Sequence, residues 1–135
     1  MDAIAIRLNP GEDLKPALLA YCIHHKINAA YILTGVGSLR QAMLRFADQP
    51  QGHRIEQKLE ILALTGTLSQ QGAHLHIAVS DHTGQIIGGH LMADSLIYTT
   101  AEIVIGVIPN LIFGRAVDPV TGYKELQIAS AFKEG

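Results

Sequence analysis

Alternation of hydrophobic and polar residues dominates this chain, and one stretch alone has the spacing of a helix. Residues 2–8 alternate and predict a strand, which the turn signal Asn-Pro-Gly at 9–11 ends. Residues 12–28 predict a helix, with acidic residues and Pro16 in its first turns and basic residues in its last. The apolar residues expected to form its buried stripe are Leu14, Leu18, Leu19, Cys22 and Ile23.

The remaining segments are apolar, often β-branched, and separated by glycines and short turns. We expect strands within 29–38, 41–48, 53–69, 73–80, 85–92, 95–109 and 110–128, the last interrupted by a turn at 118–122. One helix among many strands joined by short turns is typical of an α+β fold with a mainly antiparallel sheet. The length also suits one domain, so we predict a single domain over residues 1–135.

The composition limits the kinds of partner that such a domain is expected to bind. Charged residues make up 16% of the chain, and so low a fraction often means that an oligomer covers part of the surface. The formal net charge is −2, the sequence pI is about 6.4, and the basic residues form no run. Because nucleic-acid binding depends on Lys and Arg that neutralise phosphates, this balance argues against direct DNA binding.

Cysteine usage and the first residues indicate the compartment. Cys22 is the one cysteine, which excludes an internal disulfide, and its apolar neighbours favour a buried residue over a nucleophile. The chain begins without a basic segment, and no apolar stretch is long enough for a membrane span. We therefore expect a cytoplasmic protein with no signal peptide and no membrane partner.

Four of the seven histidines lie within the nineteen residues 73–91. In the middle of this segment, Asp81 can begin a type I turn and Gly84 can supply the positive φ of a G1 bulge. The resulting three-residue loop makes Asp81 face Gln85 and fixes the pairing of the two flanking strands.

In that register His76 faces His90, and His74 lies diagonal to His90 on the same face of the hairpin. Small residues, Ala78 and Gly88, share this face and leave room beside the histidines. The other face carries the apolar residues expected to pack on a core, which are Leu75, Ile77, Val79, Ile87 and Leu91.

Facing Cβ atoms are roughly 5 Å apart and diagonal ones about 7 Å, so the three rings can converge on one ion. Three nitrogen ligands leave a coordination position open for water, a carboxylate or another anion. Zinc is the first expectation, while imidazole also suits iron, nickel and copper. The alternative is a set of half-exposed strand histidines, which we expect for His53 and His82, and a slip of one residue would remove His90 from the group.

Two carboxylates, Glu60 and Glu102, lie in otherwise apolar strands. Either is a candidate to accept a hydrogen bond from a ligating imidazole or to act as the base for metal-bound water. The simpler interpretation, which we favour for each taken singly, is a strand-edge carboxylate paired with Arg or Lys.

Several segments resemble one known family. The most specific is HLHIAVSDHTGQIIGGHL at 74–91, supported by ILTGVGSLRQAMLRF at 32–46, LEILALTGTLS at 59–69, TAEIVI at 100–105 and DPVTGYKEL at 118–126. With these residues the sequence is similar to the PPC (plants and prokaryotes conserved) domain family in its single-domain bacterial and archaeal form. The resemblance implies an antiparallel α+β fold that assembles as a homotrimer, and a metal, usually zinc, held by the histidines at 74, 76 and 90.

The resemblance extends to further pocket candidates, which are Gly35, Gly37, Ser38, Arg40 and Glu60. In plant members the DNA contacts are made by AT-hook motifs that precede the domain, while the PPC part mediates self-association and partner binding. This chain contains no AT-hook.

Three functions fit these observations. The first, which we expect, is a trimeric metal-binding module that senses a small ligand or binds proteins in a regulatory role. The second is a transcription-related protein that binds DNA, as the family label suggests. The third is a zinc-dependent hydrolase or lyase acting on a small molecule, with Glu60 or Glu102 as the base. No nucleophile triad or phosphate-binding loop occurs in the sequence, so no motif identifies an enzyme. The metal site alone leaves open whether the protein is one.

Overall fold

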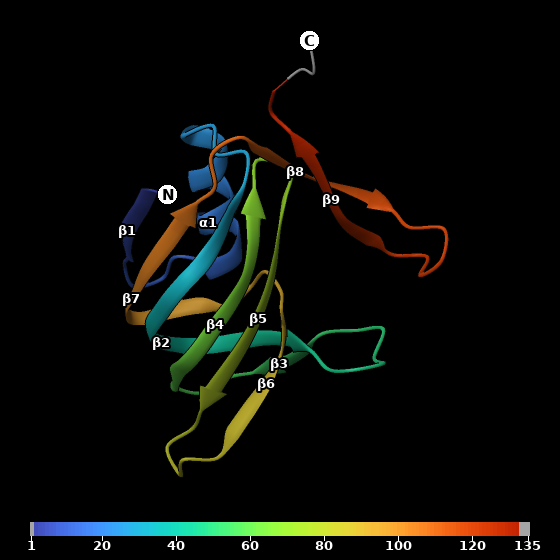
Figure 1. Ribbon diagram of the computed structural model, residues 1–135. Helices are drawn as coiled ribbons and strands as arrows, with labels where there is room; N and C mark the ends of the chain where they lie inside the picture. The colour runs from blue at the N-terminus through green and yellow to red at the C-terminus, as the bar shows by residue number, and fades with distance from the viewer. Residues whose placement is uncertain (1, 133–135) are drawn as a thin grey trace.

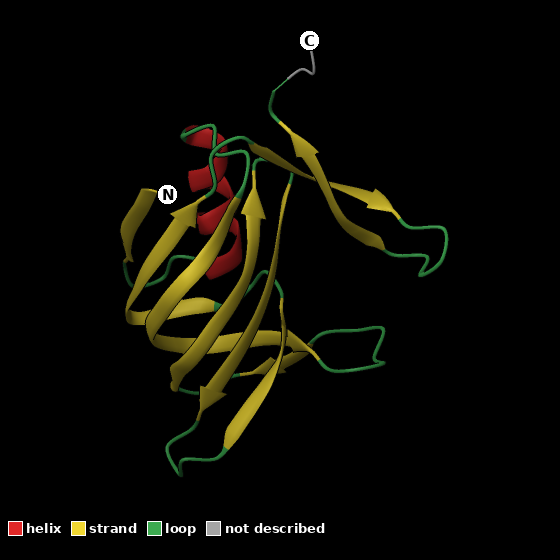
Figure 2. Ribbon diagram, viewed as in Figure 1, coloured by secondary structure: helices red, strands yellow, loops and turns green. Residues whose placement is uncertain are grey.

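The computed structural model describes residues 2–132 as an antiparallel sheet with one helix on its face (Figure 1, Figure 2). This confirms the predicted α+β class for the described residues. The helix is α1 (Leu14–His24), and the strands are β1 (Asp2–Leu8), β2 (Ala30–Arg45), β3 (His53–Ile55), β4 (Leu59–Ser69), β5 (Gly72–Ser80), β6 (Ile86–Leu91), β7 (Leu96–Val107), β8 (Leu111–Val117) and β9 (Lys124–Ser130).

Seven strands form the main sheet, in the order β1-β7-β2-β4-β5-β6, with β3 beside β2. The long strand β2 is irregular where it pairs with β7, and bulges of this kind bend a strand. Its far end consequently curls round to pair with β6, where Leu44 faces Leu91 and Arg45 faces His90. The pairing of β2 with β6 therefore closes strands β2, β4, β5 and β6 into a ring. No local sequence signal predicts this pairing.

Strands β8 and β9 pair only with each other and project from the main sheet as an arm (Figure 1). The loop between β2 and β3 projects on the same side of the molecule (Figure 1). Residues of the arm, this loop and the β5–β6 hairpin together line a cleft.

Three element boundaries differ from the prediction. Segments 29–38 and 41–48 form one strand, because β7 continues to pair with β2 at Leu39 and Gln41. Segment 53–69 is split into β3 and β4 by a short polar break. The helix covers only 14–24, since the carboxylate of Asp13 accepts hydrogen bonds from the amides of Asp94 and Ser95 rather than from its own first turn.

The helix packs its apolar stripe on the sheet as predicted for three residues. Leu14, Leu18 and Cys22 are completely buried in a core shared with β2, β4, β5 and β7. The prediction for Ile23 is wrong, because this side chain is 51% exposed on the outer side of the helix. Burial also raises the pKa of the Cys22 thiol to about 11, which keeps it protonated and unreactive at neutral pH.

Candidate metal centre

The β5–β6 hairpin has the turn that its sequence predicts. The amide of Asp81 donates to the carbonyl of Gln85 at 3.0 Å, and the amide of Gly84 donates to the carbonyl of Asp81 at 3.0 Å. The Asp81 carboxylate accepts from the amides of Thr83 and Gln85, and Gly84 has a φ of +85°. These bonds fix the register of the two strands over their whole length.

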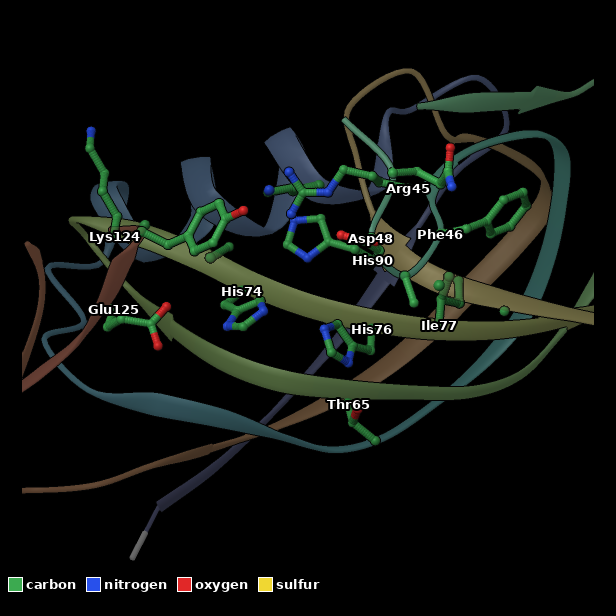
Figure 3. A pocket seen from close by; sticks show the side chains of 18 of the residues that line it. Arg45, Phe46, Asp48, Thr65, His74, His76, Ile77, His90, Lys124 and Glu125 are labelled. Carbon is green, nitrogen blue, oxygen red and sulfur yellow. The ribbon is translucent and has the colours of Figure 1, made fainter. Parts of the chain in front are cut away.

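In this register His76 faces His90, and His74 lies on the same face two residues along β5. The ring centroids are 5.0 Å apart for His74 and His76, 5.2 Å for His74 and His90, and 5.7 Å for His76 and His90. Figure 3 shows the three rings around a common space. The structure therefore brings together the three histidines that the sequence predicts to share a site.

One nitrogen from each ring lies within 4.8 Å of the others. An ion held tetrahedrally at metal–nitrogen distances near 2.0–2.1 Å requires nitrogens roughly 3.3 Å apart, which modest rotation of exposed side chains can supply. His74 and His76 are exposed and His90 is half-buried, so the rings are free to make this adjustment. The donor set fits a transition-metal ion.

The backbone beneath the histidines is held in place from the opposite face. Leu75, Ile77 and Val79 are buried in the core, so β5 cannot slip by one residue without exposing them. Gly66 on β4 has a φ of +151°, and a Cβ at this position would come within 2.0 Å of the His74 carbonyl oxygen. This glycine therefore lets β4 approach β5 closely at His74.

Basic side chains surround the histidines. Arg45 lies beside His90 because β2 and β6 pair at these residues, and its guanidinium is seen next to the His90 ring in Figure 3. Arg115, on the arm, donates through Nη2 to Thr67 Oγ1 at 2.9 Å, and Thr67 is the β4 partner of His74. Lys15, in the first turn of α1, lines the same cleft.

This environment favours the neutral form of two imidazoles. Burial, and then the charges of Arg45 and Lys15, lower the pKa of His90 to about 4. Burial, and then the charge of Arg115, also lower the pKa of His74 from its ordinary value. Neutral imidazole is the form that binds metals.

The cleft in front of the histidines has a volume of about 1520 Å³. Its walls are the β2–β3 loop, from Arg45 to Pro50, and the arm, at Arg115 and from Tyr123 to Glu125. The site is therefore open to a ligand considerably larger than water.

The remaining predicted pocket residues lie elsewhere in the chain. None of Gly35, Gly37, Ser38, Arg40, Glu60 and Glu102 lines this cleft within the single chain described. Ser38 is buried and its Oγ lies 2.7 Å from Thr99 Oγ1, which ties β2 to β7. A Cβ at Gly37 would come within 2.2 Å of the Thr100 carbonyl oxygen, so that glycine permits a close approach of the same two strands.

Glu60, Glu102 and Arg40 are exposed. Glu102 faces Arg7 across β1 and β7, yet neither glutamate forms an ion pair within residues 2–132. The simpler interpretation of these glutamates, as partners of Arg or Lys, is thus not realised in the single chain.

His53 and His82 are both exposed and lie apart from the three grouped histidines. The His53 ring packs on Phe46, with the centroids 5.4 Å apart. Both are thus more exposed than the half-exposed state expected for them.

Sequence reasoning did not identify Arg45, Lys15 or Arg115 as neighbours of the histidines. Each reaches the site through a long-range contact: the pairing of β2 with β6, the packing of the start of α1 and the hydrogen bond from the arm to β4. The alternation of polar and apolar residues in β2 and β8 shows which side chains share a face of each strand. No local feature of the sequence shows which distant strand lies against that face.

Comparison with known proteins gives the family. The sequence profile of the Plants and Prokaryotes Conserved (PCC) domain, the family abbreviated PPC above, matches residues 1–109. The chain is also 50% identical over 123 residues to Bifunctional protein GlmU of Synechococcus sp. (strain JA-2-3B'a(2-13)), covering 91% of this chain and 20% of that protein. The chain thus spans about a fifth of the length of the curated relatives it matches.

Solved structures share the whole fold. A protein of Salmonella enterica superimposes with a TM-score of 0.94 and 39% identity, covering 97% of this chain and 95% of that one. A metal-containing protein of Archaeoglobus fulgidus has a TM-score of 0.80 and 25% identity, with 94% of each chain covered. A candidate DNA-binding protein of Bacteroides thetaiotaomicron has a TM-score of 0.83 and 24% identity, covering 93% and 91% of the two chains. The family match over residues 1–109, together with these neighbours, shows that the chain belongs to the Plants and Prokaryotes Conserved domain family.

Proposed function

We propose that this protein is a metal-binding, homotrimeric module that senses a small ligand or binds a protein partner in a regulatory role. The ion is held by His74, His76 and His90, and it is zinc or another divalent transition metal such as iron or nickel. The observation that carries the proposal is the grouping of three imidazole nitrogens within 4.8 Å on one face of a rigid hairpin. The metal content of the Archaeoglobus fulgidus neighbour supports it.

A role as a module is supported by the curated relatives. In Synechococcus a segment similar to this chain makes up 20% of a longer protein, so the same domain serves there as one part of a larger molecule. A domain that recurs inside a longer protein suits binding or regulation. Among the residues described, no helix has the length and apolar character needed to cross a bilayer.

The metal is tested by elemental analysis of protein purified without chelators. We expect about one ion per chain, and its loss when His76 and His90 are both replaced by alanine, because one imidazole alone binds weakly. His82→Ala, in the exposed turn of the same hairpin, is the matched control and keeps the ion. An equal metal content in the double variant and the control would contradict the proposal.

The trimer is supported by apolar side chains left exposed in the single chain. On the arm and directly after it, the exposed fractions are 64% for Val117, 92% for Val120, 70% for Tyr123, 64% for Ile128 and 65% for Phe132. A two-stranded hairpin is at best marginally stable alone, so packing against a second copy would stabilise the arm.

Mass measurement by light scattering tests the trimer, with an expected mass near three times 14.5 kDa. Replacing Val117 and Ile128 by aspartate should release monomers, because the new charges would be buried at the interface. Ile86→Asp is the matched control, since Ile86 is 62% exposed but lies on β6. Monomers in the wild-type protein at all concentrations would exclude the trimer.

DNA binding is the second candidate, favoured by the description of the Bacteroides thetaiotaomicron neighbour and by the basic residues around the cleft. It predicts that binding to duplex DNA falls steeply with salt, by about one unit of log K per log salt for each phosphate neutralised. Fluorescence polarisation with a labelled duplex at low salt measures this. The net charge of −2 leads us to expect no specific binding.

A further inference from the structure

We infer that the cleft beside the histidines binds a small oxyanion, the carboxylate or phosphate group of a small molecule, held by Arg45, Lys15 and Arg115. The inference rests on the proposed function, because it assigns a ligand class to the same metal site. It adds a set of cationic residues that the sequence did not indicate.

Strand pairing places Arg45 beside the histidines, and a hydrogen bond to β4 places Arg115 there. Arg45, His90 and His76 are successive partners across β2, β6 and β5, so their side chains form one row on one face of the sheet. Arg115 approaches from the arm and is anchored by its hydrogen bond to Thr67. The two guanidinium groups therefore flank the histidines, one beside His90 and one beside His74.

None of the three cations has a carboxylate partner in the part of the chain that the structure describes. Lys15, Arg45 and Arg115 are half-buried, and the ion pairs formed within residues 2–132 involve only Arg54. The charges of Arg45 and Arg115 are close enough to Lys15 to lower the pKa of its amine, after the larger effect of burial. Like charges held together without a counter-charge are unfavourable, and a bound anion would remove this repulsion.

The charge of the cleft is also opposite in sign to the net charge of the whole chain. Its charged walls comprise four basic residues, Lys15, Arg45, Arg115 and Lys124, and two acidic ones, Asp48 and Glu125, whereas the whole chain has a net charge of −2. A divalent ion on three neutral imidazoles would raise the local positive charge further. The site thus favours an anion with or without the metal.

A compact oxyanion fits better than an extended polyanion. The three cations line one cleft, and the planar guanidinium forks match the paired oxygens of a carboxylate or phosphate. Phe46 also lines the cleft and can contact the apolar part of such a molecule.

Calorimetric titration of the zinc-loaded protein tests the inference, with inorganic phosphate in one arm and succinate in the other at constant ionic strength. We expect at least one of these anions to bind, and Arg45→Gln to weaken its binding at least tenfold. Arg7→Gln removes the same charge from an exposed position on β1, at the opposite edge of the sheet, and should leave the affinity within twofold. Preference for one anion identifies the oxyanion class.

The outcomes separate this inference from the metal proposal. If zinc is bound but neither anion binds, or if Arg45→Gln and Arg7→Gln weaken binding equally, the inference is wrong and the metal proposal stands. If no zinc is bound, the metal proposal fails. The same titrations on the metal-free chain then decide the inference: binding that Arg45→Gln weakens supports it, and no binding overturns it. Should Arg45→Gln fail to fold, as judged by circular dichroism, Lys15→Gln replaces it with the same expectation.

Discussion

The two hairpins of this protein, β5–β6 and β8–β9, have similar lengths but opposite surroundings. One face of β5–β6 is buried in the core, and its strands pair with β4 and with the end of β2. The β8–β9 arm pairs only with itself and exposes Val117 and Ile128. Both hairpins have a hydrogen-bonded turn, which begins at Asp81 in the first and at Asp118 in the second. The register of the first is fixed in addition by the core and by the neighbouring strands.

This difference matches what each hairpin contributes to the cleft. The proposed ion would require donors held within a few tenths of an ångström, and the β5–β6 hairpin carries all three imidazoles. The arm supplies Arg115 and Glu125, whose longer-range charge interactions tolerate movement. The three histidines, which need fixed positions, therefore lie on the β5–β6 hairpin, whose register is held by several contacts. The charged side chains that tolerate movement lie on the arm.

Native-state hydrogen exchange is expected to show the largest contrast between the hairpins. Amides of β5 should exchange only on global unfolding, which for a domain of this size costs about 5–15 kcal/mol. Amides of β8 and β9 in the Val117→Asp/Ile128→Asp variant should open at a cost of roughly 0–2 kcal/mol, because little apolar surface holds the arm. In the wild-type protein we expect intermediate arm protection that rises with protein concentration. Equal protection of both hairpins in the variant would contradict the comparison.

Replacing Gly66 or Gly84 by alanine tests how tightly the β5–β6 hairpin is held. The expected changes in the free energy of unfolding are smaller, but they depend on single contacts. Gly66→Ala places a Cβ within 2.0 Å of the His74 carbonyl oxygen, so we expect a loss of roughly 2–4 kcal/mol in the free energy of unfolding. Gly84→Ala also has a positive φ but meets nothing within 4 Å, and should cost about 1 kcal/mol. Urea denaturation measures both variants. Equal losses would mean that the close approach of β4 to β5 is not a constraint.

The sequence predicts the histidine group because every step is local. Asp81 and Gly84 define the turn, the turn defines the register, and alternation then puts His74, His76 and His90 on one face. No contact beyond the hairpin is needed. The same reasoning cannot find Arg45, because its position beside His90 depends on the bulges that curl β2 through the whole sheet.

Two errors elsewhere have different origins. Segment 29–48 looks like two strands because Gly35 and Gly37 interrupt the apolar run. In the structure the strand continues, and Gly37 permits a close approach to β7 that Ser38 reinforces by its contact with Thr99. Ile23 lies beside the apolar stripe of Leu14, Leu18 and Cys22, but its side chain is exposed on the outer side of the helix. For β2 the deciding partner is distant in the sequence, whereas for Ile23 it is the side of the helix on which the residue lies.

The smallest predicted effect is on the pH dependence of stability, and it comes from His90 on the β5–β6 hairpin. In the metal-free protein the pKa of His90 is lowered to about 4, by burial and then by Arg45 and Lys15, from an ordinary value of 6.5. Between these two values the unfolded chain binds a proton that the folded chain excludes, so stability falls as the pH drops below about 6.5. Because the ring is half-exposed, we expect only roughly 1 kcal/mol to be lost between pH 7.5 and pH 5. Urea denaturation in a chelator measures this loss, which His90→Gln should remove and His82→Gln, in the exposed turn, should retain. An unchanged pH dependence in His90→Gln would mean that the pKa of this imidazole is not lowered in the folded chain.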